Sequence, residues 1–77
     1  MKYGNDELKV MRYIYDHGTI TGREASHNLN IERLGARVFD LRQKGIPIEK
    51  FIAKSETGKR HAIYFITEEW ISSHDRP

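Results

Sequence analysis

The stretch 21–45 constrains the fold most, because it holds the start and stop signals of two short helices separated by a tight turn. Thr21 and Glu24 have the spacing of a capping box, in which hydroxyl and carboxylate each accept a hydrogen bond from a free backbone N–H. A polar turn ends at Asn30, which is a good N-cap for a further helix over about residues 31–44. The pattern therefore predicts two consecutive helices that pack closely against each other.

The second of these helices has a clear apolar seam and a polar opposite side. Ile31, Leu34, Val38 and Leu41 repeat at intervals of three and four residues, which places them on one helical face. Gly45 suits the end of the helix. The other side carries mostly polar residues: Glu32, Arg33, Ala36, Asp40 and Gln43, flanked by Arg37 and Lys44.

A further helix is expected before this pair. Asn5 or Asp6 can cap it, and its apolar stripe continues to about Asp16 before Gly18 stops it. The short segment 19–20 is too brief for an independent strand, but it can add an edge to a small sheet.

After the helices, two segments rich in β-branched and aromatic residues predict a β-hairpin. They run from Ile48 to Lys54 and from His61 to Ile66, and the residues between them include Gly58 and several basic side chains. Thr67 and the two glutamates after it then resemble the cap and acidic first turn of a short C-terminal helix.

Three helices followed by a hairpin predict an α+β fold of the winged helix-turn-helix class, as a single domain over residues 1–77. The resemblance extends to sequence. Residues 18–25 (GTITGREA), residues 33–48 (RLGARVFDLRQKGIPI) and Tyr64 resemble a family of small winged helix-turn-helix proteins of phages and prophages, over about residues 8–66. The resemblance implies DNA binding, usually regulatory, in control of transcription or of replication and recombination.

Charge is distributed unevenly along the chain. The net charge is only +2, but residues 21–60 carry nine Lys or Arg against five Asp or Glu, an excess of +4, while the flanks sum to −2. Positive charge therefore collects in the helix pair and the hairpin, where it can bind phosphates. An ordinary mixed surface would give a similar count.

Within the implied fold, the third helix lies in the major groove of double-stranded DNA and the hairpin, or wing, contacts backbone or minor groove. Arginine can bond guanine bidentately or anchor a phosphate, and hydroxyls near helix N-termini can bind phosphate. The expected DNA-binding residues are Thr21, Arg23, Ser26, Arg33, Ala36, Arg37, Gln43, Lys44, Lys54, Lys59 and Arg60.

Each of these groups also has a structural interpretation. Arg37 can form a surface ion pair with Asp40, and Arg33 with Glu32. The basic residues of the hairpin can protect an exposed strand edge. Arg42 lies close to the apolar seam, so we interpret it as structural, with its stem across the edge of the core.

Catalysis and cofactor binding are not expected. The chain has no cysteine, and its four histidines lack the spacing of a metal site. Ser26 and His27 are neighbours and point in different directions on a helix, so no nucleophile and base are paired. Neither a signal peptide nor an apolar run of about 20 residues is present, and the cytoplasm is the expected compartment.

Two questions about partners stay open at this level. At least two copies are expected on a functional operator, and Trp70 with Ile71 forms either a contact between copies or part of the monomer's own core. The main alternative to DNA binding is a module that binds a host or phage protein, which acidic Asp40 and Glu32 would favour. Of the aromatic residues, only Phe39 is expected to be half exposed.

Overall fold

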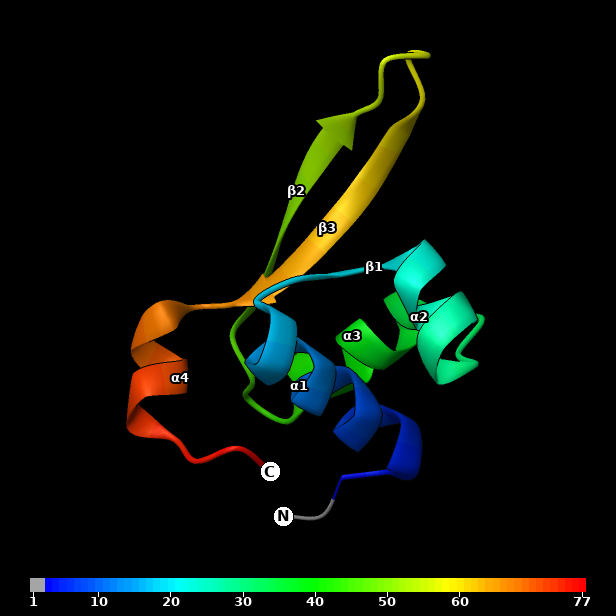
Figure 1. The fold of residues 1–77 in the computed structure, drawn as a ribbon. Helices are drawn as coiled ribbons and strands as arrows, with labels where there is room; N and C mark the ends of the chain where they lie inside the picture. The colour runs from blue at the N-terminus through cyan, green and yellow to red at the C-terminus, as the bar shows by residue number, and fades with distance from the viewer. Residues whose placement is uncertain (1–2) are drawn as a thin grey trace.

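The computed structural model describes residues 3–77, and Figure 1 shows a helical body from which a long β-hairpin projects. The expected α+β architecture, with three helices, a wing and a short C-terminal helix, is confirmed. The domain expectation of 1–77 includes residues 1–2, which lie outside the described residues. In chain order the elements are α1 (Asn5–His17), β1 (Ile20–Thr21), α2 (Gly22–Leu29), α3 (Leu34–Gln43), β2 (Ile48–Lys54), β3 (Arg60–Ile66) and α4 (Glu68–Ser73).

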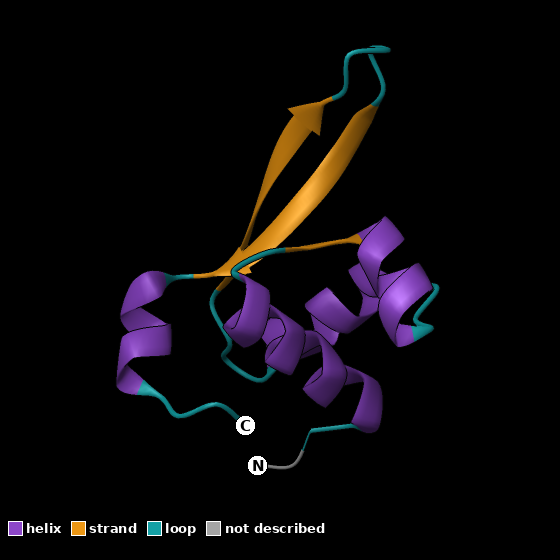
Figure 2. Ribbon diagram, viewed as in Figure 1, coloured by secondary structure: helices purple, strands orange, loops and turns teal. Residues whose placement is uncertain are grey.

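The three strands form one antiparallel sheet in the order β1-β3-β2. The short strand β1 pairs only with the middle of β3, where Ile20 lies opposite Tyr64. β2 and β3 pair over their full length, from Ile48 opposite Ile66 to Lys54 opposite Arg60. The hairpin therefore extends beyond β1 and beyond the helices, as the orange strands in Figure 2 show.

The core lies where the helices meet the base of this hairpin. Val10 and Ile14 of α1 and Leu41 of α3 have no exposed surface, and Ile48 and Ile66 close the core from the sheet. The apolar seam predicted for the third helix is thus confirmed. Burying an aliphatic side chain of this size contributes about 1.5–3 kcal/mol. The remaining core residues are Met11, Ile20, Ala25, Ile31, Leu34, Val38 and Ile46.

Two predicted helix caps were wrong. Gly4 is the N-cap of α1, and its N–H donates to Glu7 Oε1 at 3.1 Å, so neither Asn5 nor Asp6 has that role. Asn30 is the C-cap of α2, with a left-handed backbone (φ 60°) that asparagine tolerates better than most residues. α3 consequently begins at Leu34, three residues later than predicted.

The late start of α3 has a packing cause. Ile31 is 4% exposed, and its N–H donates to the Ala25 carbonyl at 2.9 Å. This residue is therefore fixed in the core as part of the turn, although its spacing also fits the helical seam. A sequence period cannot distinguish a buried turn residue from the first residue of the following helix.

The C-terminal segment lies along α1. Trp70 and Ile71 of α4 pack against the core cluster, which supports the interpretation that they belong to the monomer. Beyond α4, Arg76 forms a two-pronged ion pair with Asp16 (2.8 and 2.9 Å). Tyr15 adds a hydrogen bond from its hydroxyl to the His74 carbonyl at 3.2 Å.

The expectation that only Phe39 among the aromatic residues is half exposed was wrong. Phe51 is 48% exposed, and beside it on β2 the aliphatic Ile52 is 54% exposed. The hairpin projects past the helices, so both of its faces lack a covering element near the tip. Alternation along a strand predicts which residues share a face, but it does not reveal how far that strand extends beyond the core.

Candidate nucleic-acid interface

Tyr13 of α1 forms two hydrogen bonds with α2, which also packs on the core through Ala25. The hydroxyl of Tyr13 donates to Glu24 Oε2 at 3.1 Å and accepts from Asn28 Nδ2 at 3.2 Å. The predicted capping box is present: Thr21 Oγ1 accepts from the Glu24 N–H (3.2 Å) and Glu24 Oε1 accepts from the Thr21 N–H (3.0 Å). The start of α2 is therefore fixed relative to the body.

The tip of the wing is a compact turn. The Ser55 N–H donates to the Lys59 carbonyl at 2.8 Å, and the Gly58 N–H donates to the Ser55 carbonyl at 2.9 Å. Gly58 has φ 84°, a conformation that a side chain would strain. The hydroxyls of Ser55 and Thr57 share a further hydrogen bond at 2.9 Å. The basic residues that flank this turn therefore extend from a backbone whose conformation is fixed by hydrogen bonds.

Two of those basic residues face each other. Lys54 of β2 lies directly opposite Arg60 of β3 in the sheet register, and both are exposed. Like charges in direct cross-strand positions destabilise a sheet. An anion bound between them would remove that cost, so this pair fits a surface that binds a polyanion.

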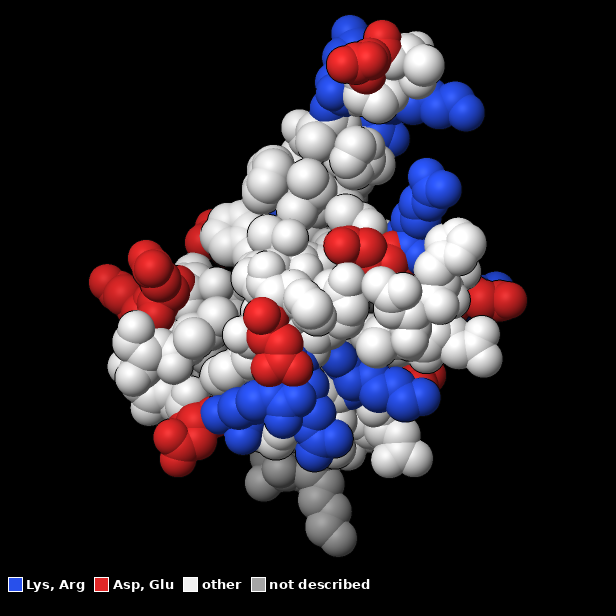
Figure 3. Space-filling model, in the orientation of Figure 1, with Lys and Arg blue, Asp and Glu red and all other residues white. Residues whose placement is uncertain are grey.

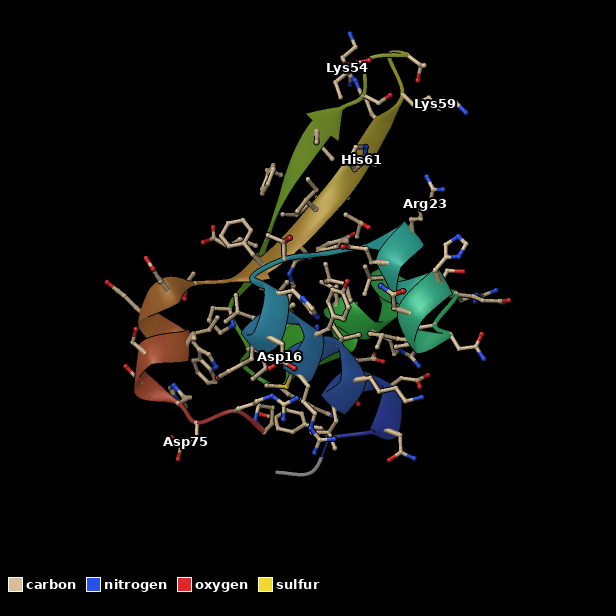
Figure 4. The ribbon with its side chains drawn as sticks, in the orientation of Figure 1. Asp16, Arg23, Lys54, Lys59, His61 and Asp75 are labelled. Carbon is tan, nitrogen blue, oxygen red and sulfur yellow. The ribbon has the colours of Figure 1, made fainter. Side chains whose placement is uncertain are left out.

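A groove with a volume of about 750 Å³ lies between the wing and the N-terminal ends of α2 and α3. We call it the wing groove. Figure 4 shows Arg23 extending from the start of α2 towards the wing, with Lys59 at the tip above it. The lining residues come from three segments: Thr21, Gly22 and Arg23; Glu32, Arg33, Leu34 and Gly35; and Ser55, Thr57, Lys59, Arg60, His61, Ala62 and Tyr64.

The wing groove brings together five of the residues predicted to bind DNA: Thr21, Arg23, Arg33, Lys59 and Arg60. Lys54 joins them through its place opposite Arg60. In Figure 3 basic side chains gather at the wing tip together with an acidic one, a second basic cluster lies at the bottom of the view, and the acidic side chains of α4 lie on another side of the molecule. The electrostatic arrangement suits an anionic ligand that lies across α2, α3 and the wing.

Two other predicted residues lie away from this groove. Arg37 forms the ion pair with Asp40 that the sequence suggested (3.1 Å), and it lines a separate hollow beside Asp6. Lys44 binds Glu7 at 2.7 Å, on the side of α1. Both side chains therefore form ion pairs within the domain.

The last three predicted residues do not line the groove. Ser26 and Gln43 are exposed, on α2 and α3, and Ala36 is half-buried on α3. Arg42, interpreted as structural, donates from Nε to the Ile48 carbonyl at 2.9 Å and so ties α3 to the base of the wing.

Sequence reasoning missed part of the groove lining. Ser55 and Thr57 at the tip and Tyr64 on β3 line the groove but were not expected to contact a ligand. The alternation of β3 offered a signal, because Arg60, Ala62 and Tyr64 share one face of that strand.

The model of the winged helix-turn-helix domain family matches residues 7–69, and the chain belongs to that family. Domains of this family are typically DNA-binding modules without enzymatic activity, and membership therefore indicates DNA binding. Comparison with curated proteins and with solved structures gave no match. Among the described residues, no helix is long and apolar enough to cross a membrane.

Proposed function

We propose that the domain binds double-stranded DNA, with α3 in the major groove and the wing on the backbone or the minor groove. The observation that carries this proposal is the convergence of Arg23, Arg33 and the wing's Lys59 and Arg60 on one groove. These residues come from three separate segments, so their convergence is a property of the fold. Phosphate contacts from such groups position a protein on a duplex, while base contacts determine the sequence.

The biological role that fits best is regulatory. A small DNA-binding domain acts by occupying a site, so it would control transcription, replication or recombination in a phage, a prophage or their host. The site of action would then be the host cytoplasm. This setting rests on the resemblance of the stretch 33–48 to small phage proteins.

Two copies on a functional operator are part of the proposal. One module covers only about 600–1,000 Å² of DNA-facing surface, which limits its specificity. Two modules on half-sites about one helical turn apart would double the sequence that is read. Footprinting on a selected site gives the number of half-sites occupied.

Titration with salt and a duplex of random sequence tests the binding. If four to six phosphates are neutralised, log K should fall against log salt with a slope of about −4 to −5. Equal affinity at low and physiological salt would overturn the proposal.

A module that binds a host or phage protein is the second candidate, and the outer face of the wing favours it. Phe51 and Phe65 form an aromatic pair there with ring centroids 5.8 Å apart. Glu32 also lines the wing groove, where its negative charge repels phosphate. A slope of log K against log salt near zero with duplex DNA would favour this candidate. If it is right, the variant Phe51→Ala should lose binding to the partner protein.

A further inference from the structure

The outward side of α3 is less basic than its sequence suggests. Leu34, Val38 and Leu41 are at most 4% exposed and mark the side of α3 that faces the core. With 100° per residue, the opposite side of the helix carries Ala36, Phe39, Asp40 and Gln43. Phe39 is 61% exposed, the largest value among the exposed large hydrophobic residues of the described chain.

The cations of this helix are bound within the protein. Arg37 pairs with Asp40 at 3.1 Å, and Arg42 donates to the Ile48 carbonyl at 2.9 Å. Just after the helix, Lys44 pairs with Glu7 at 2.7 Å. The outward side of α3 therefore presents a phenyl ring, a methyl group and an amide, beside the Asp40 carboxylate that Arg37 binds, and the basic residues of the wing groove flank it.

These three groups match the chemistry of one kind of base pair. In the major groove only thymine carries a C5-methyl group, and apolar side chains such as Ala and Phe contact it. Glutamine bonds adenine bidentately through N6 and N7. We propose that α3 recognises A·T base pairs, with Phe39 and Ala36 against thymine methyl groups and Gln43 on adenine.

This inference rests on the proposed function. The positive charge around α3 is complementary to the phosphates of DNA, which identifies the ligand. Arg33 lies at the N-cap of α3, and the wing places Lys59 and Arg60 across the groove from it. A polyanion that reaches these groups can also cover the outward side of α3. Phe39 is thus a specificity-determining residue, while the basic groups supply affinity that is independent of sequence.

The test begins with duplexes selected from a random pool by the wild-type protein. The best duplex is compared with a copy in which uracil replaces every thymine of the footprint, which removes only the methyl groups. Each methyl buried against Phe39 or Ala36 should contribute about a fourfold difference in affinity. With one or two such methyl groups buried, the uracil duplex should bind about four- to fifteenfold more weakly.

Two phenylalanine variants then assign the effect. Phe39→Ala should lower the ratio of thymine to uracil affinity about fourfold, because the ring that contacts one methyl group is gone and only the contribution of Ala36 is left. Phe51→Ala is the matched control: it removes a ring that is also exposed, but on the wing, and it should keep the wild-type ratio. Thermal unfolding of both variants verifies that the fold is retained.

Several outcomes overturn the inference. They are equal binding of both duplexes by wild type, an unchanged ratio in Phe39→Ala, or selection of sites without A·T pairs or of no preferred site. The salt slope with random duplex separates these results from failure of DNA binding itself. A steep slope with no thymine preference leaves the proposed function standing and removes only the role of Phe39.

Discussion

Lys44 Nζ lies 2.8 and 2.7 Å from the two carboxylate oxygens of Glu7, which joins the residue after α3 to the first turn of α1. Glu7 is 9% exposed and also accepts from the Gly4 N–H at 3.1 Å. Burial would raise the pKa of Glu7, but these hydrogen bonds and the charges of Lys44 and Arg37 outweigh it and hold the pKa below its ordinary value. The ion pair thus fixes the far end of the proposed recognition helix.

Glu7→Gln should therefore lower the free energy of unfolding near pH 7 by about 1.5–3 kcal/mol, the range for hydrogen bonds to charged groups. A depressed pKa in the folded state adds stability above the unfolded pKa, about 4.3 for Glu, and this stability is lost as pH falls through the folded value. The difference between wild type and variant should shrink in acid. Thermal unfolding from pH 7 to pH 2.5 measures it.

Glu68→Gln is the control for this experiment, because Glu68 is exposed on α4. Its unfolding free energy at pH 7 should fall by less than about 1 kcal/mol, the most that an exposed carboxylate in a first helical turn contributes. A Glu7→Gln variant whose deficit is the same at every pH would show that the contribution of Glu7 is independent of its charge.

The two arginines near the start of α3 should differ in their effects on DNA binding. Arg33 is exposed in the wing groove, and its replacement by Ala should cost about 1–3 kcal/mol on the preferred site if it reads a base. Arg37 is held by Asp40, so Arg37→Ala should cost less. Titration of both variants with selected and random duplexes measures the difference.

The comparison of duplexes assigns the role of Arg33. A base reader loses less affinity for random DNA than for the selected site, whereas a phosphate anchor loses the same on both. If neither variant weakens binding, neither arginine contacts the DNA, and recognition by α3 would rest on its other side chains.

The sequence predicted those features of the fold that rest on local chemistry. The capping box at Thr21 and the apolar seam on α3 follow from residue types at fixed spacing, and both are present. The partner of Lys44 could not be predicted, because Glu7 is far away along the chain and only folding brings the two together. For the same reason, the convergence of basic residues on the wing groove became visible only in three dimensions, whereas the pair of Arg37 with Asp40, three residues away, was visible in the sequence.

The wing tip should supply affinity without affecting the fold. Replacing Lys59 and Arg60 together with Ala should weaken duplex binding and reduce the salt slope by about one unit for each phosphate that is no longer neutralised. Both residues are exposed, so thermal unfolding should change little. Salt titrations of wild type and variant measure the slopes.

Lys9→Ala provides a control for charge at a distance, because Lys9 is exposed on α1. It should leave the slope nearly unchanged. Equal slopes for wild type and the wing variant would assign Lys59 and Arg60 to solubility or edge protection.

Trp70 should matter for stability and not for association. Its side chain packs on the core cluster, and its ring stacks on His74 with centroids 3.5 Å apart. Trp70→Ala removes a large half-buried side chain, so it should lower the free energy of unfolding by about 2–4 kcal/mol, near the range for large-to-small core changes. Light scattering should give the same mass for wild type and variant without DNA, and footprinting should show both half-sites of the selected operator still occupied. A lower mass or a single occupied half-site in the variant would place Trp70 at the contact between copies, against its observed packing.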